Sequence, residues 1–495
     1  MLVLERSSAT PLYEQIYQYI KARIEAGQYE AGTRLPSVRS LAGEIGVSKI
    51  TVEQAYLQLA AEGYIKAHDR SPYEVLALPL TGDTIFAGVS GVDSLFQKSR
   101  AVKLDESVTV ETGLGKALSP FAGADSLMAS NVAVKPVIEY NFATGAMDPE
   151  GFDYTRWKRY IGYVLREPER LLAYGDPQGE LELRLQLAQY LNTARAVRTT
   201  AEQIIIGSGT QAMVMMIAAL LKRAHITTVA IDHSALIGVT HIFKDYGFTV
   251  VTIDQHSESL IADLMRANVQ ALYCTPSHGD RQGRVMSAGR RKELLQWSKA
   301  VGSYLIEDDY DSELRYYGRP ISSLQGLARE EHVIYLGTPS KVLPPSIRIS
   351  YMVLPPSLWN DFLMYRSSYR QSASVMEQLV WARYMAAGEW SKQIRRLRKH
   401  YADKSKQLVS QLQLAFGDQA KAYLPEGGVY IGLSVYTLLG ADDLLAKARQ
   451  AGCDVRIEAD IATEGEVHCL LSFSAIPTAK LHAAVTRLAA AWKGV

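Results

Sequence analysis

Short apolar runs alternate with longer helical stretches along residues 136–495, and this alternation constrains the fold more than any other feature. The runs have strand character, and each is separated from the next by enough residues for a helix: Gln203–Ile206, Thr228–Ile231, Val250–Ile253, Ala271–Cys274, Ser303–Ile306 and Val333–Leu336. A strand that returns to pair in parallel needs such a crossover. The pattern therefore predicts an α/β domain built on a mainly parallel sheet.

The pattern changes at about residue 380. Long basic and amphipathic helical stretches follow, and then two more strand-like runs, Gly428–Leu433 and His468–Phe473. This change predicts that the α/β domain carries a smaller C-terminal α+β subdomain.

Residues 1–79 have a helical pattern of their own. Apolar residues spaced four apart predict a first helix within residues 11–27: Leu12, Ile16, Ile20 and Ile24. A second helix is expected to start at Pro36-Ser37 and to stop at Gly46, and a third to be capped by Ser48 and to end at Gly63. Tyr64–Leu78 has strand character around turn residues, which suits a two-stranded wing.

Three short helices followed by a hairpin are typical of a winged helix-turn-helix, and a helical protein-interaction module is the alternative. In the first case the third helix enters the major groove by its N-terminal end. The predicted DNA contacts are Arg39, Ser48, Lys49, Thr51, His68 and Arg70. Charge does not decide the matter, because residues 1–79 hold 8 basic and 9 acidic side chains. Binding would depend on a local basic edge.

The residues of the second and third helices carry a resemblance. They read Leu35-Pro36-Ser37-x-Arg39-x-Leu41-Ala42, then Gly46-Val47-Ser48-x-x-Thr51-Val52-x-x-Ala55-Tyr56-x-x-Leu59-x-x-Glu62-Gly63-Tyr64. This stretch closely resembles the GntR family of bacterial regulators, which implies binding to double-stranded DNA. The wing differs: the family has a Gly-rich turn there, and this chain reads Asp69-Arg70-Ser71-Pro72-Tyr73.

Residues 80–135 are rich in Gly, Ala, Ser and Val and have only weak periodicity. Such a stretch does not bury enough apolar surface to form a core. It is predicted to be a long linker between residues 1–79 and residues 136–495.

A lysine directly after a predicted strand suggests cofactor chemistry. Lys341 follows Thr338 and Ser340, and Arg348 comes seven residues later. A lysine that forms a Schiff base with pyridoxal 5'-phosphate needs a phosphate site nearby, and hydroxyls with an arginine supply one. Each of these features alone is weak evidence, since most lysines after strands lie on the surface.

Two earlier segments fit the same cofactor. Asp308, at the end of another apolar strand, can pair with a pyridinium nitrogen, and Tyr310 can donate to the phenolic oxygen. The turn Gly207-Ser208-Gly209-Thr210-Gln211 lies between a strand and a helix, where backbone amides hold phosphate.

These segments, in this order, resemble fold-type-I aminotransferases. Three phrases resemble the MocR subfamily of GntR regulators in particular: Tyr174-Gly-Asp-Pro-x-Gly179-x-x-x-Leu183-Arg184, Ile306-Glu-Asp-Asp-Tyr-Asp-Ser-Glu-Leu-Arg-Tyr316, and Leu336-Gly-x-x-Ser-Lys341-x-Leu-x-Pro-x-x-Arg348-x-x-Tyr351. The resemblance implies that Lys341 is the Schiff-base lysine and that the other cofactor contacts are Asp308, Tyr310, Thr338, Ser340, Arg348, Gly209, Thr210 and His278.

Three segments depart from the family. Asp232–Leu236 lacks the family's stacking aromatic ring, and the loop Thr275–Gly283 is altered. Leu470-Leu471-Ser472-Phe473 stands where aminotransferases hold the substrate carboxylate with an arginine. Losing a buried clamp of this kind costs about 2–5 kcal/mol. Its place can be taken by one of three arginines elsewhere, Arg456, Arg281 or Arg284.

The sequence therefore predicts a cytoplasmic, homodimeric regulator that binds operator DNA and senses either pyridoxal phosphate itself or an amino acid or amine. The alternative is an active aminotransferase with an accessory DNA-binding domain, because the retained Lys341 and Asp308 are enough for a residual half-reaction. The sequence contains no uninterrupted apolar run of 18 residues, so no membrane span is predicted. Three scattered cysteines, Cys274, Cys453 and Cys469, are expected to be reduced and mostly buried.

Overall fold

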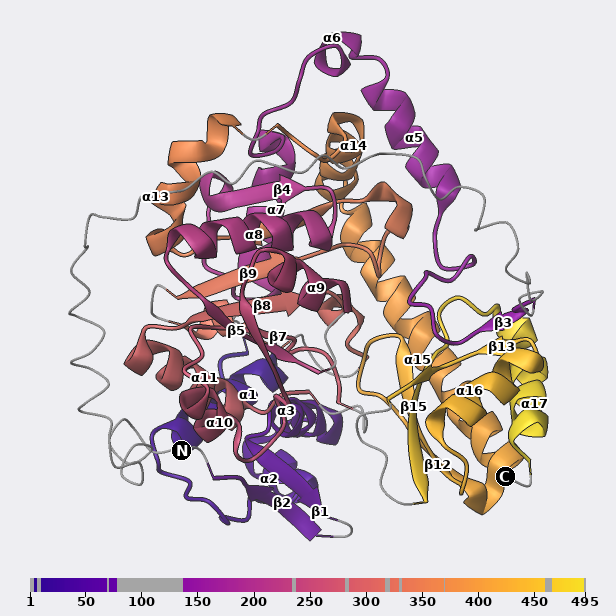
Figure 1. Ribbon diagram of the computed structural model, residues 1–495. Helices are drawn as coiled ribbons and strands as arrows, with labels where there is room; N and C mark the ends of the chain where they lie inside the picture. The colour runs from indigo at the N-terminus through magenta and orange to yellow at the C-terminus, as the bar shows by residue number, and fades with distance from the viewer. Residues whose placement is uncertain are drawn as a thin grey trace. The chain divides into compact units, whose positions relative to one another are not determined.

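The computed structural model describes residues 4–6, 10–68, 71–77, 137–233, 237–280, 285–316, 321–328, 332–368, 370–458 and 465–493 (Figure 1). The predicted linker, residues 80–135, lies outside the described residues, and so do Asp69 and Arg70 of the wing turn.

The N-terminal part has the predicted three helices and hairpin: α1 (Leu12–Glu25), α2 (Val38–Ile45), α3 (Lys49–Ala61), β1 (Ile65–His68) and β2 (Ser71–Val75). The predicted caps are present. Ser37 accepts from the amide of Ser40, Gly46 is left-handed at φ 65°, and Ser48 accepts from the amide of Thr51. A small core holds the elements together: Ile16, Ile20, Ile24, Leu41, Val52, Ala55, Tyr56 and Leu59 are all buried in it. The winged helix-turn-helix is confirmed.

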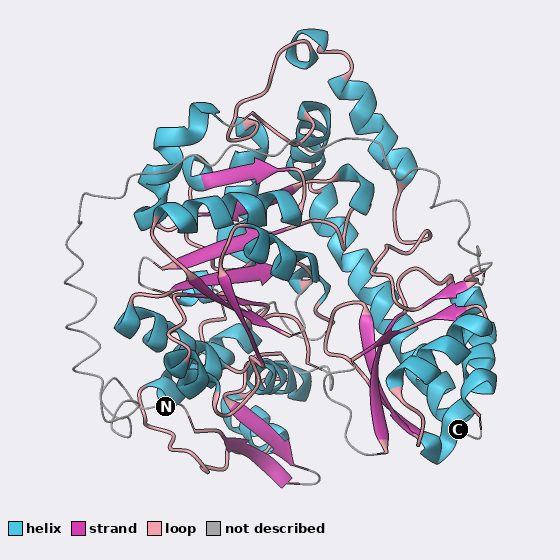
Figure 2. Cartoon of the chain, in the orientation of Figure 1, coloured by secondary structure: helices cyan, strands magenta, loops and turns pink. Residues whose placement is uncertain are grey.

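Figure 2 draws the strands in magenta. The large sheet has seven of them, in the order β4-β10-β9-β8-β7-β5-β6. The six predicted runs correspond to β4 (Ile204–Gly207), β5 (Thr228–Asp232), β6 (Thr249–Ile253), β7 (Ala271–Cys274), β8 (Tyr304–Asp309) and β9 (Val333–Gly337). Every pairing among β5 to β9 is parallel, which confirms the mainly parallel sheet. The seventh strand, β10 (Ser350–Val353), was not predicted, and it runs antiparallel between β4 and β9.

Helices cover both faces of this sheet (Figure 1). On one face, residues such as Ile205, Ile306 and Leu336 pack against α8 (Thr210–Arg223), α9 (Ile237–Asp245) and α13 (Pro356–Tyr365). The alternate strand residues face the opposite layer, which contains α7 (Leu181–Ala194), α10 (Leu260–Arg266), α11 (Ala288–Val301), α14 (Val375–Ala386) and α15 (Glu389–Phe416). Successive side chains of a strand point to opposite faces of the sheet, so a strand between two helical layers packs against both.

The C-terminal subdomain is α+β, as predicted. Its sheet has the order β11-β12-β15-β14, and the two predicted runs correspond to β12 (Tyr430–Tyr436) and β15 (Glu466–Ser472). The outer strands are β11 (Ala420–Tyr423) and β14 (Arg456–Ile457). One apolar face of the sheet packs against α15, α16 (Ala441–Gln450) and α17 (Leu481–Trp492).

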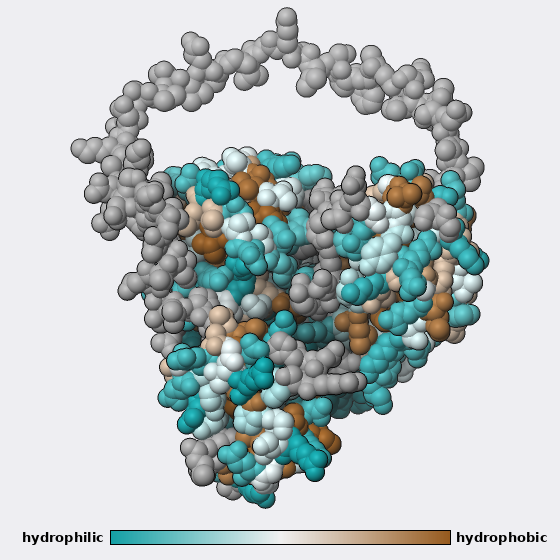
Figure 3. Space-filling view, turned by 90° about the horizontal axis from the view of Figure 1, so that it is seen from below, coloured by the Kyte–Doolittle hydropathy of each residue, from teal (hydrophilic) through white to brown (hydrophobic). Residues whose placement is uncertain are grey.

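Short elements complete the described fold: β3 (Tyr140–Asn141), β13 (Cys453–Asp454), α5 (Tyr154–Val164), α6 (Pro168–Leu171), α12 (Leu324–Leu327), and six 3-10 turns at Ala201–Gln203, Ser312–Leu314, Pro345–Ile347, Arg366–Ser368, Gly417–Gln419 and Thr478–Lys480. The three cysteines are buried free thiols, as predicted. Among the described residues, no helix is long and apolar enough to cross a membrane. The face drawn in Figure 3 mixes hydrophilic and hydrophobic residues.

Candidate cofactor site and DNA-binding surface

Lys341 lies at the carboxyl end of β9, after the turn Thr338-Pro339-Ser340. Its Nζ donates to the carbonyl oxygen of Gly145 at 2.8 Å, and the ring centroid of Tyr430 is 6.0 Å away. A Cβ on residue 145 would collide with Nζ and with the hydroxyl of Tyr430, so glycine lets both side-chain ends approach the backbone there. Burial lowers the pKa of the Lys341 ammonium, with Asp311 opposing it more weakly. A lowered pKa makes the neutral, nucleophilic amine easier to reach.

Arg348 and the turn before α8 meet although 139 positions separate Arg348 from Gly209 in the sequence. Gly209 is the N-cap of α8 with φ +88°, and a Cβ on it would lie 2.3 Å from Arg348 Nη2. The guanidinium therefore lies directly over the start of a 14-residue helix whose first residue is Thr210. A helix N-terminus and a guanidinium together form an anion-binding site.

The two predicted hydroxyls differ in their surroundings. Thr338 is buried, and its Oγ1 donates to the carbonyl oxygen of Ile349 at 3.2 Å, which ties the end of β9 to the start of β10. Ser340 is half-buried beside Lys341. Contacts of these hydroxyls to a phosphate stay predictions.

Asp308 is 3 % exposed on β8. The hydroxyl of Tyr273 donates to its Oδ2, and its Oδ1 is buried with no hydrogen-bond partner among the described residues. Burial raises the pKa of Asp308 to about 7, against the opposing effect of the Tyr273 hydrogen bond. A buried carboxylate oxygen without a partner is costly. A protonated ring nitrogen would satisfy it, so Asp308 fits a pyridinium.

Three rings gather beside Lys341. The centroids of His278 and Tyr310 are 4.9 Å apart with planes tilted by 39°, and Tyr430 meets His278 edge-on at 6.2 Å. His278 Nδ1 lies 2.7 Å from Asp311 Oδ2, which fixes the orientation of the imidazole. Burial raises the pKa of Tyr310 well above its ordinary value, which keeps its hydroxyl protonated as a donor.

Sequence reasoning missed four residues of this site: Gly145, Tyr273, Asp311 and Tyr430. Asp311 lies within the acidic phrase that carries the resemblance, so it had a signal in the sequence. Tyr430 and Tyr273 lie inside the predicted strands Gly428–Leu433 and Ala271–Cys274, but nothing in those runs marks their roles. Their roles and that of Gly145 depend on contacts with distant segments.

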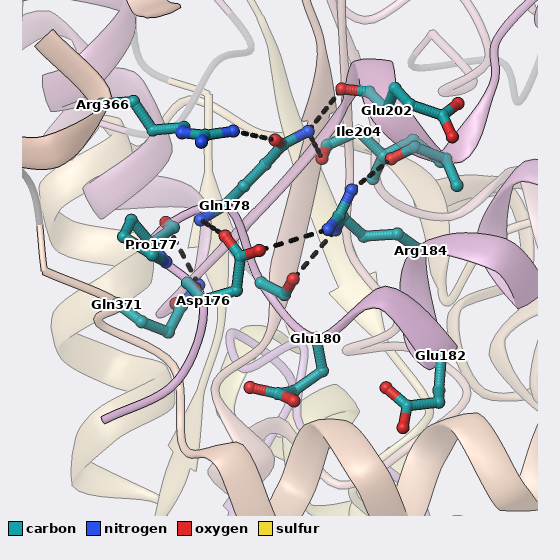
Figure 4. A network of polar contacts seen from close by, with 12 residues as sticks. Asp176, Pro177, Gln178, Glu180, Glu182, Arg184, Glu202, Ile204, Arg366 and Gln371 are labelled. Carbon is teal, nitrogen blue, oxygen red and sulfur yellow. Dashed lines mark hydrogen bonds and ion pairs between the residues drawn. The ribbon is translucent and has the colours of Figure 1, made fainter. Parts of the chain in front are cut away.

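The Tyr174–Arg184 motif is a hydrogen-bonded loop that is attached to the edge strand β4 (Figure 4). Arg184 donates to the carbonyl oxygens of Gly179 and Ala201, each at 2.8 Å, and lies 3.5 Å from Asp176. Gln178 donates from Nε2 to the carbonyl oxygen of Ile204 on β4 at 2.9 Å. These hydrogen bonds fix the position of β4, the strand that leads into the Gly207–Thr210 turn.

On the DNA-binding part, the start of α3 is open to solvent. Lys49 and Arg39 are exposed, as DNA contacts require. The Oγ atoms of Ser48 and Thr51 lie 2.7 Å apart, so both hydroxyls already take part in the cap. Ile50 is 66 % exposed and was missed by sequence reasoning. An exposed apolar side chain there suits a thymine methyl. The side chain of His68 and all of Arg70 lie outside the described residues.

Comparisons with known proteins agree with this two-part arrangement. Residues 12–75 match the family of bacterial regulatory proteins called gntR, and residues 140–469 match aminotransferase class I and II. The uncharacterized HTH-type transcriptional regulator YdeL of Bacillus subtilis is 31% identical over 99% of this chain and 98% of its own. The probable rhizopine catabolism regulatory protein MocR of Rhizobium meliloti is 29% identical over 91% of this chain and 87% of its own. The chain belongs to the MocR subfamily of GntR regulators.

The crystal structure of Pyrococcus horikoshii kynurenine aminotransferase shows the same fold as the larger part of this MocR-type regulator. Its TM-score is 0.62 at 24% identity, and the match covers 75% of this chain and 97% of that one. Both relatives above are named as regulators. The family match makes pyridoxal phosphate the cofactor.

Proposed function

We propose that this MocR-type regulator uses its aminotransferase-like site as a sensor whose occupancy changes operator binding by α3. One observation carries the proposal. Lys341, the Arg348–Gly209 anion site and the unsatisfied Asp308 carboxylate oxygen converge in a chain that also has a winged helix-turn-helix.

Each group in the site has a task toward the cofactor. When bound, pyridoxal phosphate supplies an aldehyde that reacts with primary amines. Arg348 and the amides at the start of α8 bind its phosphate, with hydroxyl contacts from Ser340, Thr338 and Thr210. Asp308 accepts the proton on the ring nitrogen, and Tyr310 donates to the phenolic oxygen. Lys341 provides the amine of the resting protein, and His278 covers the site from the Thr275 loop.

The effector is pyridoxal phosphate itself, or an amino acid or amine that meets the cofactor at Lys341. The protein is proposed not to be an enzyme, because Leu470 stands in place of the arginine that orients a transaminase substrate. Lys341 and Asp308 still permit a residual half-reaction. Steady release of a keto acid from amino acids would favour the aminotransferase alternative.

The operator affinity of the full chain should change with occupancy of this site. Measured on DNA from the chain's own upstream region, with and without pyridoxal phosphate and candidate amines, the dissociation constant should shift by about fivefold or more, the usual size of a coupling between two sites. Equal affinity for DNA under all these conditions would reject the sensor proposal.

The DNA contacts can be tested separately. Arg39→Ala and Lys49→Ala should each weaken operator binding by roughly fivefold and lower its salt dependence, because each removes a phosphate contact. Arg23→Ala is the matched control, since the Arg23 guanidinium packs 4.7 Å from the ring of Tyr19 on α1. Wild-type binding by both test variants would show that the assignment of α3 is wrong.

The protein is also proposed to be a cytoplasmic homodimer with domains at 1–79 and 136–495. Two copies would present two helices α3 to the two half-sites of a symmetric operator. The exposed apolar side chains around α6, Leu172 at 87% and Tyr174 at 90%, are available for a second copy.

A further inference from the structure

The sheet of the C-terminal subdomain has two chemically different faces. Ile431 and Leu433 of β12, with Cys469 and Leu471 of β15, lie in the apolar core beneath the helices. The alternate positions point to the other face, and Tyr430 among them lies beside Lys341. The end of this second face that holds Tyr430 is therefore directed toward the cofactor site.

Leu470 is on the second face, where an aminotransferase would have its arginine. It is 7% exposed but does not belong to the apolar core, unlike its neighbours Cys469 and Leu471. The pairing register places it between two partners. Gly432 of β12 lies on one side, and Arg456 of β14 lies on the other.

Arg456 is thus the direct cross-strand neighbour of Leu470. Side chains paired in this way point to the same face, about 5 Å apart. The positive charge of Arg456 acts on the tyrosines beside Lys341. It lowers the pKa values of Tyr310 and Tyr430, against the larger increase that burial causes. The other two arginines considered, Arg281 and Arg284, lie outside the described residues.

We propose that Arg456 binds the anionic group of the effector, and that the effector is a primary amine that carries a carboxylate. This inference rests on the proposed function, in which an amine meets the cofactor at Lys341. The guanidinium is moved by one strand relative to an aminotransferase, and Leu470 fills the vacated position. Recognition of a carboxylate is thereby retained, while the substrate orientation needed for transamination is lost.

The test is a calorimetric titration of the cofactor-loaded full chain with carbon-matched pairs: glycine and ethylamine, β-alanine and propylamine, γ-aminobutyrate and butylamine. At least one amino acid should bind about tenfold or more tightly than its partner amine, the size of a charge-assisted hydrogen bond. Arg456→Met should remove this preference. Adding Leu470→Arg to that variant should restore it, which also excludes a folding defect.

Arg449→Met is the matched control, because Arg449 lies on the same subdomain and pairs with Asp454 at 2.8 Å. Its preference should equal that of the wild type. A loaded wild type with no preference for any amino acid would overturn the proposal for Arg456, and so would an unchanged preference in Arg456→Met. Failure of the chain to take up the cofactor at all would instead defeat the proposed function.

Discussion

Lys341→Ala is expected to remove the absorbance band of the covalent imine from the cofactor-loaded protein and to weaken pyridoxal phosphate binding at least about 100-fold. In the proposed site this band arises from the imine between the cofactor aldehyde and Lys341, and the variant has only noncovalent contacts to the phosphate and ring. Arg348, Gly209 and Asp308 remain in the variant, so weak binding with the spectrum of the free aldehyde should persist. Absorbance spectroscopy and equilibrium dialysis measure the two effects separately.

Lys392→Ala is the matched control for this experiment, because its side chain is 57% exposed and pairs with Glu389 on α15. It should keep the imine band with unchanged cofactor affinity. An imine band in Lys341→Ala would show that another amine holds the cofactor, and a wild type without this band after incubation with pyridoxal phosphate would contradict the cofactor site.

The parallel strands could be predicted because buried strands between two helical layers are continuous apolar runs, as in Ala271–Cys274. The strand β10 was missed for a related reason. It begins two residues after Arg348 and follows β9 without a long helical stretch between them, so it lacks the crossover that marked the other strands. Its place between β4 and β9 depends on antiparallel pairing with both, which a local pattern does not encode.

The site was predictable where its residues follow a strand and carry a recognisable phrase, as Asp308 and Lys341 do. It was not predictable where a role arises from distant contacts. In the sequence, Tyr273 is one residue of an apolar strand, and only the structure shows its hydrogen bond to Asp308. Gly145 likewise looks like an ordinary loop glycine, and only the structure shows that its carbonyl accepts from Lys341. The relation of Arg456 to Leu470 depends on strand register, which the sequence of a two-residue strand such as β14 does not reveal.

A second large effect is expected where the site rests on a buried ion pair. Arg195→Met should lower the free energy of unfolding by about 3–5 kcal/mol, because it leaves the carboxylate of Asp309 buried without its cation. Arg195 and Asp309 are 1% and 2% exposed, and Arg195 Nε donates to Asp309 Oδ2 at 2.7 Å. The hydroxyl of Tyr335 also donates to this oxygen, at 2.6 Å, but it brings no charge.

Urea denaturation of the cofactor-free protein measures this loss, and two further variants identify its cause. Arg266→Met should have little effect, because Arg266 is 76% exposed in its pair with Asp263 and exposed pairs contribute little. The double variant Arg195→Met, Asp309→Leu should recover part of the lost stability, since no unpaired charge then remains in the core. A double variant less stable than Arg195→Met would show that the hydrogen bonds of Asp309, and not its unpaired charge, determine the cost. Asp309 is next to Asp308 on β8, so Arg195→Met should also weaken cofactor binding, although Arg195 is not among the residues proposed to bind the cofactor.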